Sequence, residues 1–118
     1  MDKIFIKNLQ VYGILGIHPR EQRTPQKIRV SVEVSTDISE AAENDDVLKS
    51  VDYSVLSQEI IRFIDASHFL TIEALIEAMA ENILENDLVS SVWIRIEKPN
   101  AVSEAESVGV EITRGKNR

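Results

Sequence analysis

The sequence contains no cysteine, and it has few glycines, prolines and aromatic residues. The lack of cysteine excludes disulfides, thiolate nucleophiles and zinc fingers, and it fits a reducing compartment. No run approaches the roughly 20 apolar residues of a membrane span, and residues 1–5 lack the apolar core of a signal peptide. We therefore expect a cytoplasmic protein without a membrane partner.

The charge of the chain is acidic, with 13 Lys and Arg against 20 Asp and Glu and a formal net charge of −7. Proteins that bind nucleic acids usually present a basic patch or stripe, and no dense run of Lys and Arg is present here. A nucleic-acid partner is therefore not expected. Hydrophobic residues make up 43% of the 118 residues, enough for a core, so residues 1–118 are expected to form one domain.

The spacing of apolar residues predicts four strands and two helices. The strands are expected over residues 4–11, 28–35, 90–98 and 106–114. The first helix is expected from Tyr53 or Ser54 to Ala66, with Asp52 as its N-cap. Thr71 is expected to cap the second helix, whose apolar stripe continues to Leu84. The predicted order of elements is β-β-α-α-β-β.

Two amphipathic helices cannot cover both faces of a four-stranded sheet, so we expect both on its apolar face. The other face should be polar, and it is expected to carry Arg29, Glu33, Arg95, Glu97 and Glu111. The predicted fold class is α+β, with two layers and an antiparallel sheet. Such an open sheet leaves edges, which favours association through them.

Lys98 is the most informative residue of the strand expected over residues 90–98. Counted by twos, it falls on the same side as Val92, Ile94 and Ile96, where the alternation has placed core residues. A lysine is rarely buried without a partner or a task. Lys98 is therefore a candidate functional residue.

Three further candidates each have an ordinary structural explanation as well. Glu21 lies in the long segment 12–26 between the first two strands, where it could be a solvated loop charge. Tyr53 could pack its ring on the core, and Glu73 could be favoured by the dipole of the second helix, worth roughly 0.3–1 kcal/mol. His18 and His68 have no ligand-like spacing, so no metal site is expected.

Several short motifs, taken together and in order, resemble the dihydroneopterin aldolase family. They are Tyr12-Gly13-x-x-Gly16 followed by Glu21, Asp45-Asp46, Val51-Asp52-Tyr53, Ile72-Glu73, Lys98-Pro99-x-Ala101 and Val108-Gly109-Val110. The resemblance spans the whole chain. It implies the tunnelling fold, whose order of elements is the one predicted above.

The resemblance also implies an activity in folate biosynthesis. The family cleaves 7,8-dihydroneopterin by a retro-aldol reaction to 6-hydroxymethyl-7,8-dihydropterin and glycolaldehyde. The C=N bond of the pterin ring accepts the electrons of the broken bond, so no metal, cofactor or Schiff base is implied. The chain is then expected to be an enzyme, a carbon–carbon lyase, with a pterin as its small-molecule partner.

Residue roles follow from the same resemblance. Lys98, Tyr53 and Glu21 are implied as catalytic: Lys98 would relay protons, and Tyr53 would protonate the intermediate. Glu73 would accept paired hydrogen bonds from the pterin ring. The ring slot would be lined by Ile72, Val51 and Asp52, and Glu21 would contact the tail of the substrate or orient Lys98. The slot is implied to lie between subunits of a homo-octamer, or of a tetramer.

Two alternatives remain open at this point. The paralogous dihydroneopterin triphosphate epimerase shares the fold and similar acid/base residues. A triphosphate would favour a basic cluster, and Arg20 and Arg23 lie near Glu21, but the domain is acidic overall. A non-catalytic pterin-binding protein of this fold would be marked by loss of the lysine or the tyrosine, and the chain has both.

Overall fold

The computed structural model describes residues 1–116, and it follows the predicted order of elements with three short additions. The elements are β1 (Asp2–Leu15), β2 (Gln26–Thr36), α1 (Ser39–Asn44), the 3-10 helix η1 (Val47–Lys49), α2 (Tyr53–Ala66), β3 (His68–Phe69), α3 (Ile72–Leu84), β4 (Ser91–Pro99) and β5 (Ser107–Gly115). The additions are α1, η1 and β3. Asn117 and Arg118, at the end of the expected domain, lie outside the described residues. No helix within residues 1–116 is long and apolar enough to cross a membrane.

The sheet has five strands in the order β3-β1-β2-β4-β5. The pairs β1/β2, β2/β4 and β4/β5 are antiparallel, whereas β3 pairs with β1 in parallel. The prediction of a four-stranded, purely antiparallel sheet was therefore wrong by one short strand. Because β3 has only two residues, it leaves no periodic signal in the sequence. It forms where the connection between α2 and α3 passes the end of β1.

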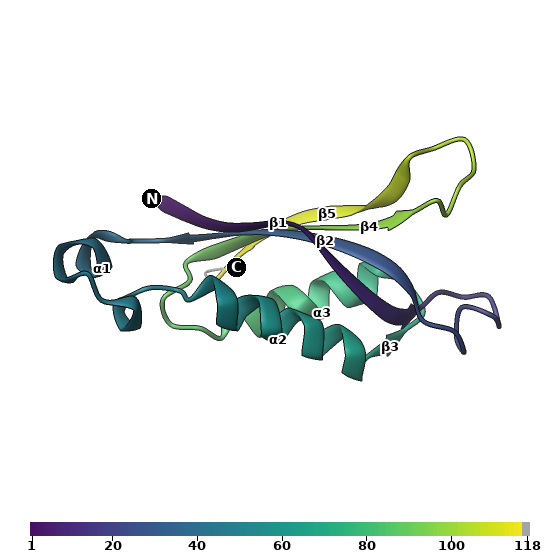
Figure 1. The fold of residues 1–118 in the computed structure, drawn as a ribbon, viewed down its shortest axis with the longest axis horizontal. Coiled ribbons are helices and arrows are strands. Elements are labelled where there is room, and N and C mark those ends of the chain that lie inside the picture. Colours follow the sequence, from purple (N-terminus) through teal and green to yellow (C-terminus); the bar gives the residue numbers. More distant parts are fainter. Residues whose placement is uncertain (117–118) are drawn as a thin grey trace.

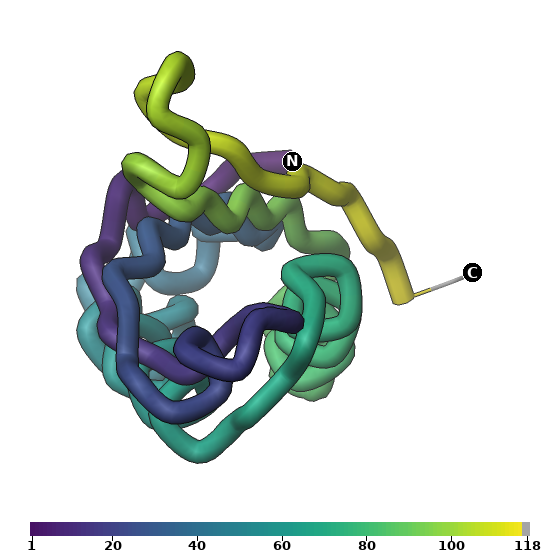
Figure 2. Tube along the Cα trace, turned by 90° about the vertical axis from the view of Figure 1, so that its right-hand side faces the viewer, coloured from purple at the N-terminus to yellow at the C-terminus, as the bar shows by residue number. Residues whose placement is uncertain are grey.

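The two long helices lie on one face of the sheet, as expected (Figure 1). Seen along the long axis of the molecule, the sheet arches over this helical layer (Figure 2). Between them lies a core in which the apolar face of β2 meets the apolar stripes of the helices. Core residues with at most 2% of their surface exposed include Val30, Val32, Val34, Ile60, Ile64, Leu75, Met79, Ile94 and Ile96.

Both long helices begin at the predicted residues. The Asp52 carboxylate accepts hydrogen bonds from the backbone N–H groups of Ser54 and Val55, and the Thr71 hydroxyl accepts one from Ala74. Such caps satisfy N–H groups that have no partner inside the helix. They fix the first turns of α2 and α3, which carry Tyr53 and Glu73.

Glu97 was expected on the polar face of the sheet, the face without helices, and the structure shows that its side chain is buried. Only 7% of Glu97 is exposed. The Ser107 hydroxyl donates a 2.6 Å hydrogen bond to Glu97 Oε1, and the guanidinium groups of Arg29 and Arg95 lie 3.9 and 3.7 Å from its carboxylate oxygens. The alternation along one strand cannot reveal this burial, because the covering side chains come mainly from β2 and β5.

Candidate functional site

Lys98 and Glu21 form an ion pair at one end of the sheet. The Lys98 Nζ atom lies 3.1 Å from Glu21 Oε2, and the two side chains are 13% and 25% exposed. Val92, Ile94 and Ile96 are buried on the apolar face of β4, so the predicted parity of Lys98 accounts for its low exposure. Because strand β4 ends at Pro99, the ammonium lies at the rim of the core.

Glu21 is held by further donors besides Lys98. The backbone N–H of His18 donates to Glu21 Oε1 at 3.3 Å, and the Gln26 side-chain amide donates to Oε2 at 3.5 Å. Burial acts to raise the pKa of the Glu21 carboxyl, but the hydrogen bonds from Lys98, His18 and Gln26 and the charge of Lys98 outweigh it. The pKa is therefore below its ordinary value of 4.5, and Glu21 is a carboxylate at neutral pH.

The ion pair lines a cavity of about 690 Å³ together with the start of α3. Ile72 and Glu73, two of the residues predicted for the pterin slot, are part of the same wall. The other lining residues are Gly16, Ile17, His18, Arg20, Thr24, Pro25, Gln26, Leu70, Thr71, Pro99, Asn100, Ala101 and Val108. The loops that supply them gather at one end of the molecule, which faces the viewer in Figure 2. Lys98, Glu21, Ile72 and Glu73 are thus brought together within one chain.

This arrangement suits proton transfer beside a polar heterocycle. A lysine hydrogen-bonded to a carboxylate can exchange protons with a bound molecule, directly or through a water. The Glu73 carboxylate is exposed in the first turn of α3, and two acceptor oxygens match a pair of adjacent N–H groups. Nothing in this geometry requires a covalent intermediate.

Tyr53, Asp52 and Val51 lie elsewhere. They line a separate hollow of about 490 Å³ with residues of α1 and η1, at the opposite end of the molecule in Figure 1. Helix α2 has 14 residues. Since a helix rises about 1.5 Å per residue, Tyr53 is about 20 Å from the end of α2 that approaches β3. Tyr53 therefore cannot reach Lys98 of its own chain, and 64% of it is exposed.

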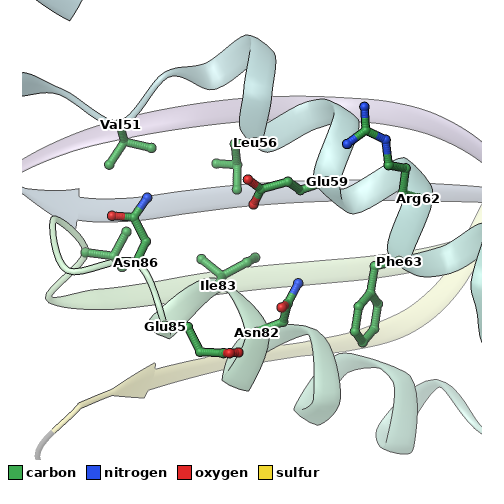
Figure 3. Close-up of a pocket in the computed structure, with 10 residues that line it drawn as sticks. Val51, Leu56, Glu59, Arg62, Phe63, Asn82, Ile83, Glu85 and Asn86 are labelled. Carbon is green, nitrogen blue, oxygen red and sulfur yellow. The ribbon is translucent and has the colours of Figure 1, made fainter. Parts of the chain in front are cut away.

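A third hollow, of about 610 Å³, lies between α2 and α3. Figure 3 shows the apolar side chains of Leu56, Phe63 and Ile83 and the charged side chains of Glu59 and Arg62 among the residues that line it. Val51 is the only predicted site residue in its lining. The predicted site residues therefore do not converge on this hollow.

The segment between the first two strands was predicted to be a loop over residues 12–26, but the loop is shorter than that. Strand β1 continues to Leu15 and β2 begins at Gln26, so the loop covers only residues 16–25. Strand β3 then pairs with β1 at Ile14 and Leu15. No sequence pattern predicts a role for Gln26, and Gly16 is distinguished in the sequence only as part of a motif.

Within residues 1–116, no group of three or more His, Cys, Asp or Glu converges in a way that could hold a metal ion. His18 and His68, the two histidines of the sequence, lie in the loop after β1 and in β3. Neither histidine side chain forms part of a cluster of that kind.

Comparisons of the sequence and of the fold with known proteins give the same result. A family model described as dihydroneopterin aldolase matches residues 4–113. The dihydroneopterin aldolase of Haemophilus influenzae is 36% identical over 115 residues, which are 98% of this chain and 98% of that protein. The crystal structure of Escherichia coli dihydroneopterin aldolase in complex with neopterin is similar with a TM-score of 0.93 and 33% identity, covering 98% of this chain and 100% of that chain. A Burkholderia dihydroneopterin aldolase bound to guanine gives a TM-score of 0.84 at 26% identity, covering 98% and 92% of the two chains.

Proposed function

The chain belongs to the dihydroneopterin aldolase family, and from this premise we propose how its own residues carry out the reaction. It is a dihydroneopterin aldolase, a lyase of folate biosynthesis. The observation that carries the residue assignment is the 3.1 Å pair of Lys98 and Glu21 in the same cavity as Glu73. The substrate we assign to this cavity is 7,8-dihydroneopterin.

In the proposed complex, Glu73 binds the pterin ring. Its carboxylate accepts hydrogen bonds from the 2-amino group and the adjacent ring N–H, a bidentate match. Ile72, the neighbouring residue, packs against the ring. This orientation directs the hydroxylated tail of the substrate toward Lys98 and Glu21, which line the same cavity.

The proposed chemistry is proton transfer with the substrate as its own electron sink. Lys98, through a water, takes the proton from the tail hydroxyl next to the scissile carbon–carbon bond. The carbon that bears this hydroxyl becomes the aldehyde carbon of glycolaldehyde as the carbon–carbon bond breaks. The electrons of the broken bond move into the C=N bond of the ring, and the ring nitrogen is protonated. Protonation of the remaining side-chain carbon, with loss of the proton from the ring nitrogen, then restores the C=N bond and gives 6-hydroxymethyl-7,8-dihydropterin. Because the ring accepts the electrons, this scheme needs no metal, cofactor or Schiff base.

The proton donor in the last step is proposed to be Tyr53 of the partner subunit. Tyr53 lies about 20 Å along α2 from the Lys98 end of its own chain, so a neighbouring copy must supply it. Asp52 and Val51, beside it, would line the slot from the same side. Strand β5 leaves an unpaired edge through which such a neighbour can associate. We propose a homo-octamer built from tetrameric rings, with a site at each subunit boundary.

The cytoplasm is the proposed compartment. A chain without cysteine is compatible with a reducing environment, in keeping with this assignment. Fractionation of cells that carry the protein at its native level tests the proposal. Recovery with the membrane pellet or the extracellular medium would contradict it.

Product analysis tests the activity directly. The purified protein is incubated with 7,8-dihydroneopterin, or with its triphosphate, in the presence of a metal chelator, and the products are separated. Release of glycolaldehyde from the unphosphorylated substrate is the expected result. Formation of an epimer from the triphosphate alone would identify an epimerase instead, and binding without turnover would identify a pterin-binding protein.

A further inference from the structure

Gly16 lies directly against the Glu21 carboxylate. Its φ of +140° belongs to a region that side chains with a Cβ rarely adopt. A Cβ on Gly16 would overlap the Oε1, Cδ and Cβ atoms of Glu21. Both the backbone conformation and the space at this position therefore require glycine if Glu21 is to stay where it is.

Gly16 also connects Glu21 to the segment that leads into α3. The Gly16 N–H donates a 3.3 Å hydrogen bond to the carbonyl of Phe69, which continues the pairing of β1 with β3. Two residues after Phe69, Thr71 caps α3, and Glu73 lies in the first turn. The contact therefore links the Lys98–Glu21 pair to the carboxylate proposed to bind the ring.

Gln26 holds the opposite side of Glu21. Its Nε2 atom donates to the Leu15 carbonyl and, at 3.5 Å, to Glu21 Oε2. Gln26 is the first residue of β2 and is paired with Gly13 of β1. An amide anchored on two paired strands is a rigid donor, whereas Glu21 itself lies on a loop.

Together these contacts leave the Glu21 carboxylate little freedom. Oε2 accepts from Lys98 and Gln26, Oε1 accepts from the His18 N–H, and the Gly16 backbone packs against Oε1. A carboxylate has about four acceptor sites, so three are used by the protein. The orientation of Glu21 in turn sets the direction of the Lys98 ammonium, and Lys98 lines the same cavity.

We propose that Gly16 and Gln26 are positioning residues, which hold the Glu21 carboxylate so that Lys98 points at the tail of the substrate. This inference rests on the proposed function for its link to turnover. Neither residue needs to touch the substrate for this role. Both act through Glu21, so their effects should depend on the presence of that carboxylate.

The test is a double-mutant cycle between Gln26→Met and Glu21→Gln. Gln26→Met keeps the length of the side chain and removes the donor. We expect kcat to fall on the order of tenfold with KM nearly unchanged, because one hydrogen bond to a charged group is lost. In the Glu21→Gln background, Gln26→Met should cause little further loss. Equal losses in both backgrounds would overturn the proposal.

A matched control is Gln22→Met. Gln22 lies in the same loop, and its side-chain amide donates to the Ile17 carbonyl at 3.1 Å rather than to Glu21. We expect this variant to keep kcat within about twofold of the parent protein. A loss as large as that of Gln26→Met would mean that general weakening of the loop, and not the donor to Glu21, is responsible.

A second readout does not depend on turnover. Carbon-13 NMR of glutamate carboxyl groups, with Glu21 assigned from Glu21→Gln, reports its titration directly. Lys98, His18, Arg20 and Glu73 line the same cavity and are unchanged by Gln26→Met. The pKa of Glu21 should rise in Gln26→Met and not in Gln22→Met. An unchanged pKa would contradict the inference even if the parent protein cleaved dihydroneopterin, while absence of cleavage with a raised pKa would overturn only the proposed function.

Gly16→Ala tests the other side of the carboxylate, with Gly115→Ala as its control. A Cβ at Gly115 meets no atom closer than 3.9 Å, and it has no positive φ. We expect Gly16→Ala to lower both the Tm and the activity, and Gly115→Ala to change neither. Should Gly16→Ala fail to fold, the Gln26 cycle and the NMR titration still decide the proposal.

Discussion

The Lys98 ammonium lies 3.1 Å from Glu21 Oε2, although the two residues are 77 positions apart in the sequence. Lys98 lies near the end of β4, and Glu21 lies in the loop between β1 and β2. The pair is therefore complete within a single chain. Glu73 lines the same cavity, whereas Tyr53 lies at the far end of α2. In the proposed mechanism, one chain thus supplies Lys98, Glu21 and Glu73, and a second chain supplies Tyr53.

Lys98→Met should reduce turnover far more than binding. Methionine keeps most of the apolar stem but removes the proton-transferring group, and such groups contribute about 10²- to 10⁴-fold to a rate. We expect kcat to fall within that range, while the Kd for neopterin, measured by fluorescence, changes by less than about threefold. Lys49→Met is the control, because Lys49 forms an ion pair with Glu40 outside the cavity. Near-parental turnover of Lys98→Met would remove Lys98 from the mechanism.

Glu73→Gln should weaken binding of the pterin ring. A neutral amide presents one acceptor where the carboxylate presents two, so it cannot accept both N–H groups of the ring. Hydrogen bonds to charged groups contribute about 1.5–3 kcal/mol, which corresponds to a Kd raised on the order of ten- to hundredfold. Isothermal titration with neopterin measures the change. Glu81→Gln, at an exposed position later in α3, should leave the Kd unaffected.

Glu21→Gln should lower stability in a pH-dependent way. Burial acts to raise the pKa of Glu21, but the donors around the carboxylate hold it below 4.5. A group whose pKa is lowered on folding stabilises the fold above its unfolded value, and this contribution is lost as the pH falls through the folded pKa. The Tm difference between the parent protein and Glu21→Gln should therefore be present at neutral pH.

The same difference should shrink as the pH falls below 4.5, when Glu21 becomes protonated in both the folded and unfolded states. Thermal melts followed by circular dichroism from neutral pH to about pH 3 give the whole curve. Glu104→Gln, exposed in the turn between β4 and β5, is the matched control and should show little difference at any pH. If the difference in Tm between the parent protein and Glu21→Gln does not change with pH, the ion pair is excluded as the source of that difference.

Much of the fold could be predicted from periodicity. The alternation of β2 and the caps at Asp52 and Thr71 are local signals, and the structure has all three. Strand parity also anticipated the low exposure of Lys98. What periodicity could not supply was β3, because its two residues pair with β1 through contacts made only in the folded chain.

The site was predicted less completely than the fold. Lys98, Glu21, Ile72 and Glu73 converge on one cavity, and their roles remain predictions until they are measured. Gln26 carries no motif, since an amide becomes a donor to Glu21 only when two strands are paired. Burial of Glu97 likewise depends on neighbours from other strands. Sequence patterns report which face a residue is on, but they do not report which distant side chains meet it.

Subunit complementation is the most direct test of a site shared between two chains. Lys98→Met and Tyr53→Phe, each of low activity alone, are mixed, dissociated and reassembled. If every site combines Lys98 from one chain with Tyr53 from its partner, about a quarter of the sites in a random mixture contain both parental residues. We expect activity to rise to about a quarter of that of the parent protein. Activity that stays at the sum of the two separate variants would contradict it, because each site would then lie within one chain.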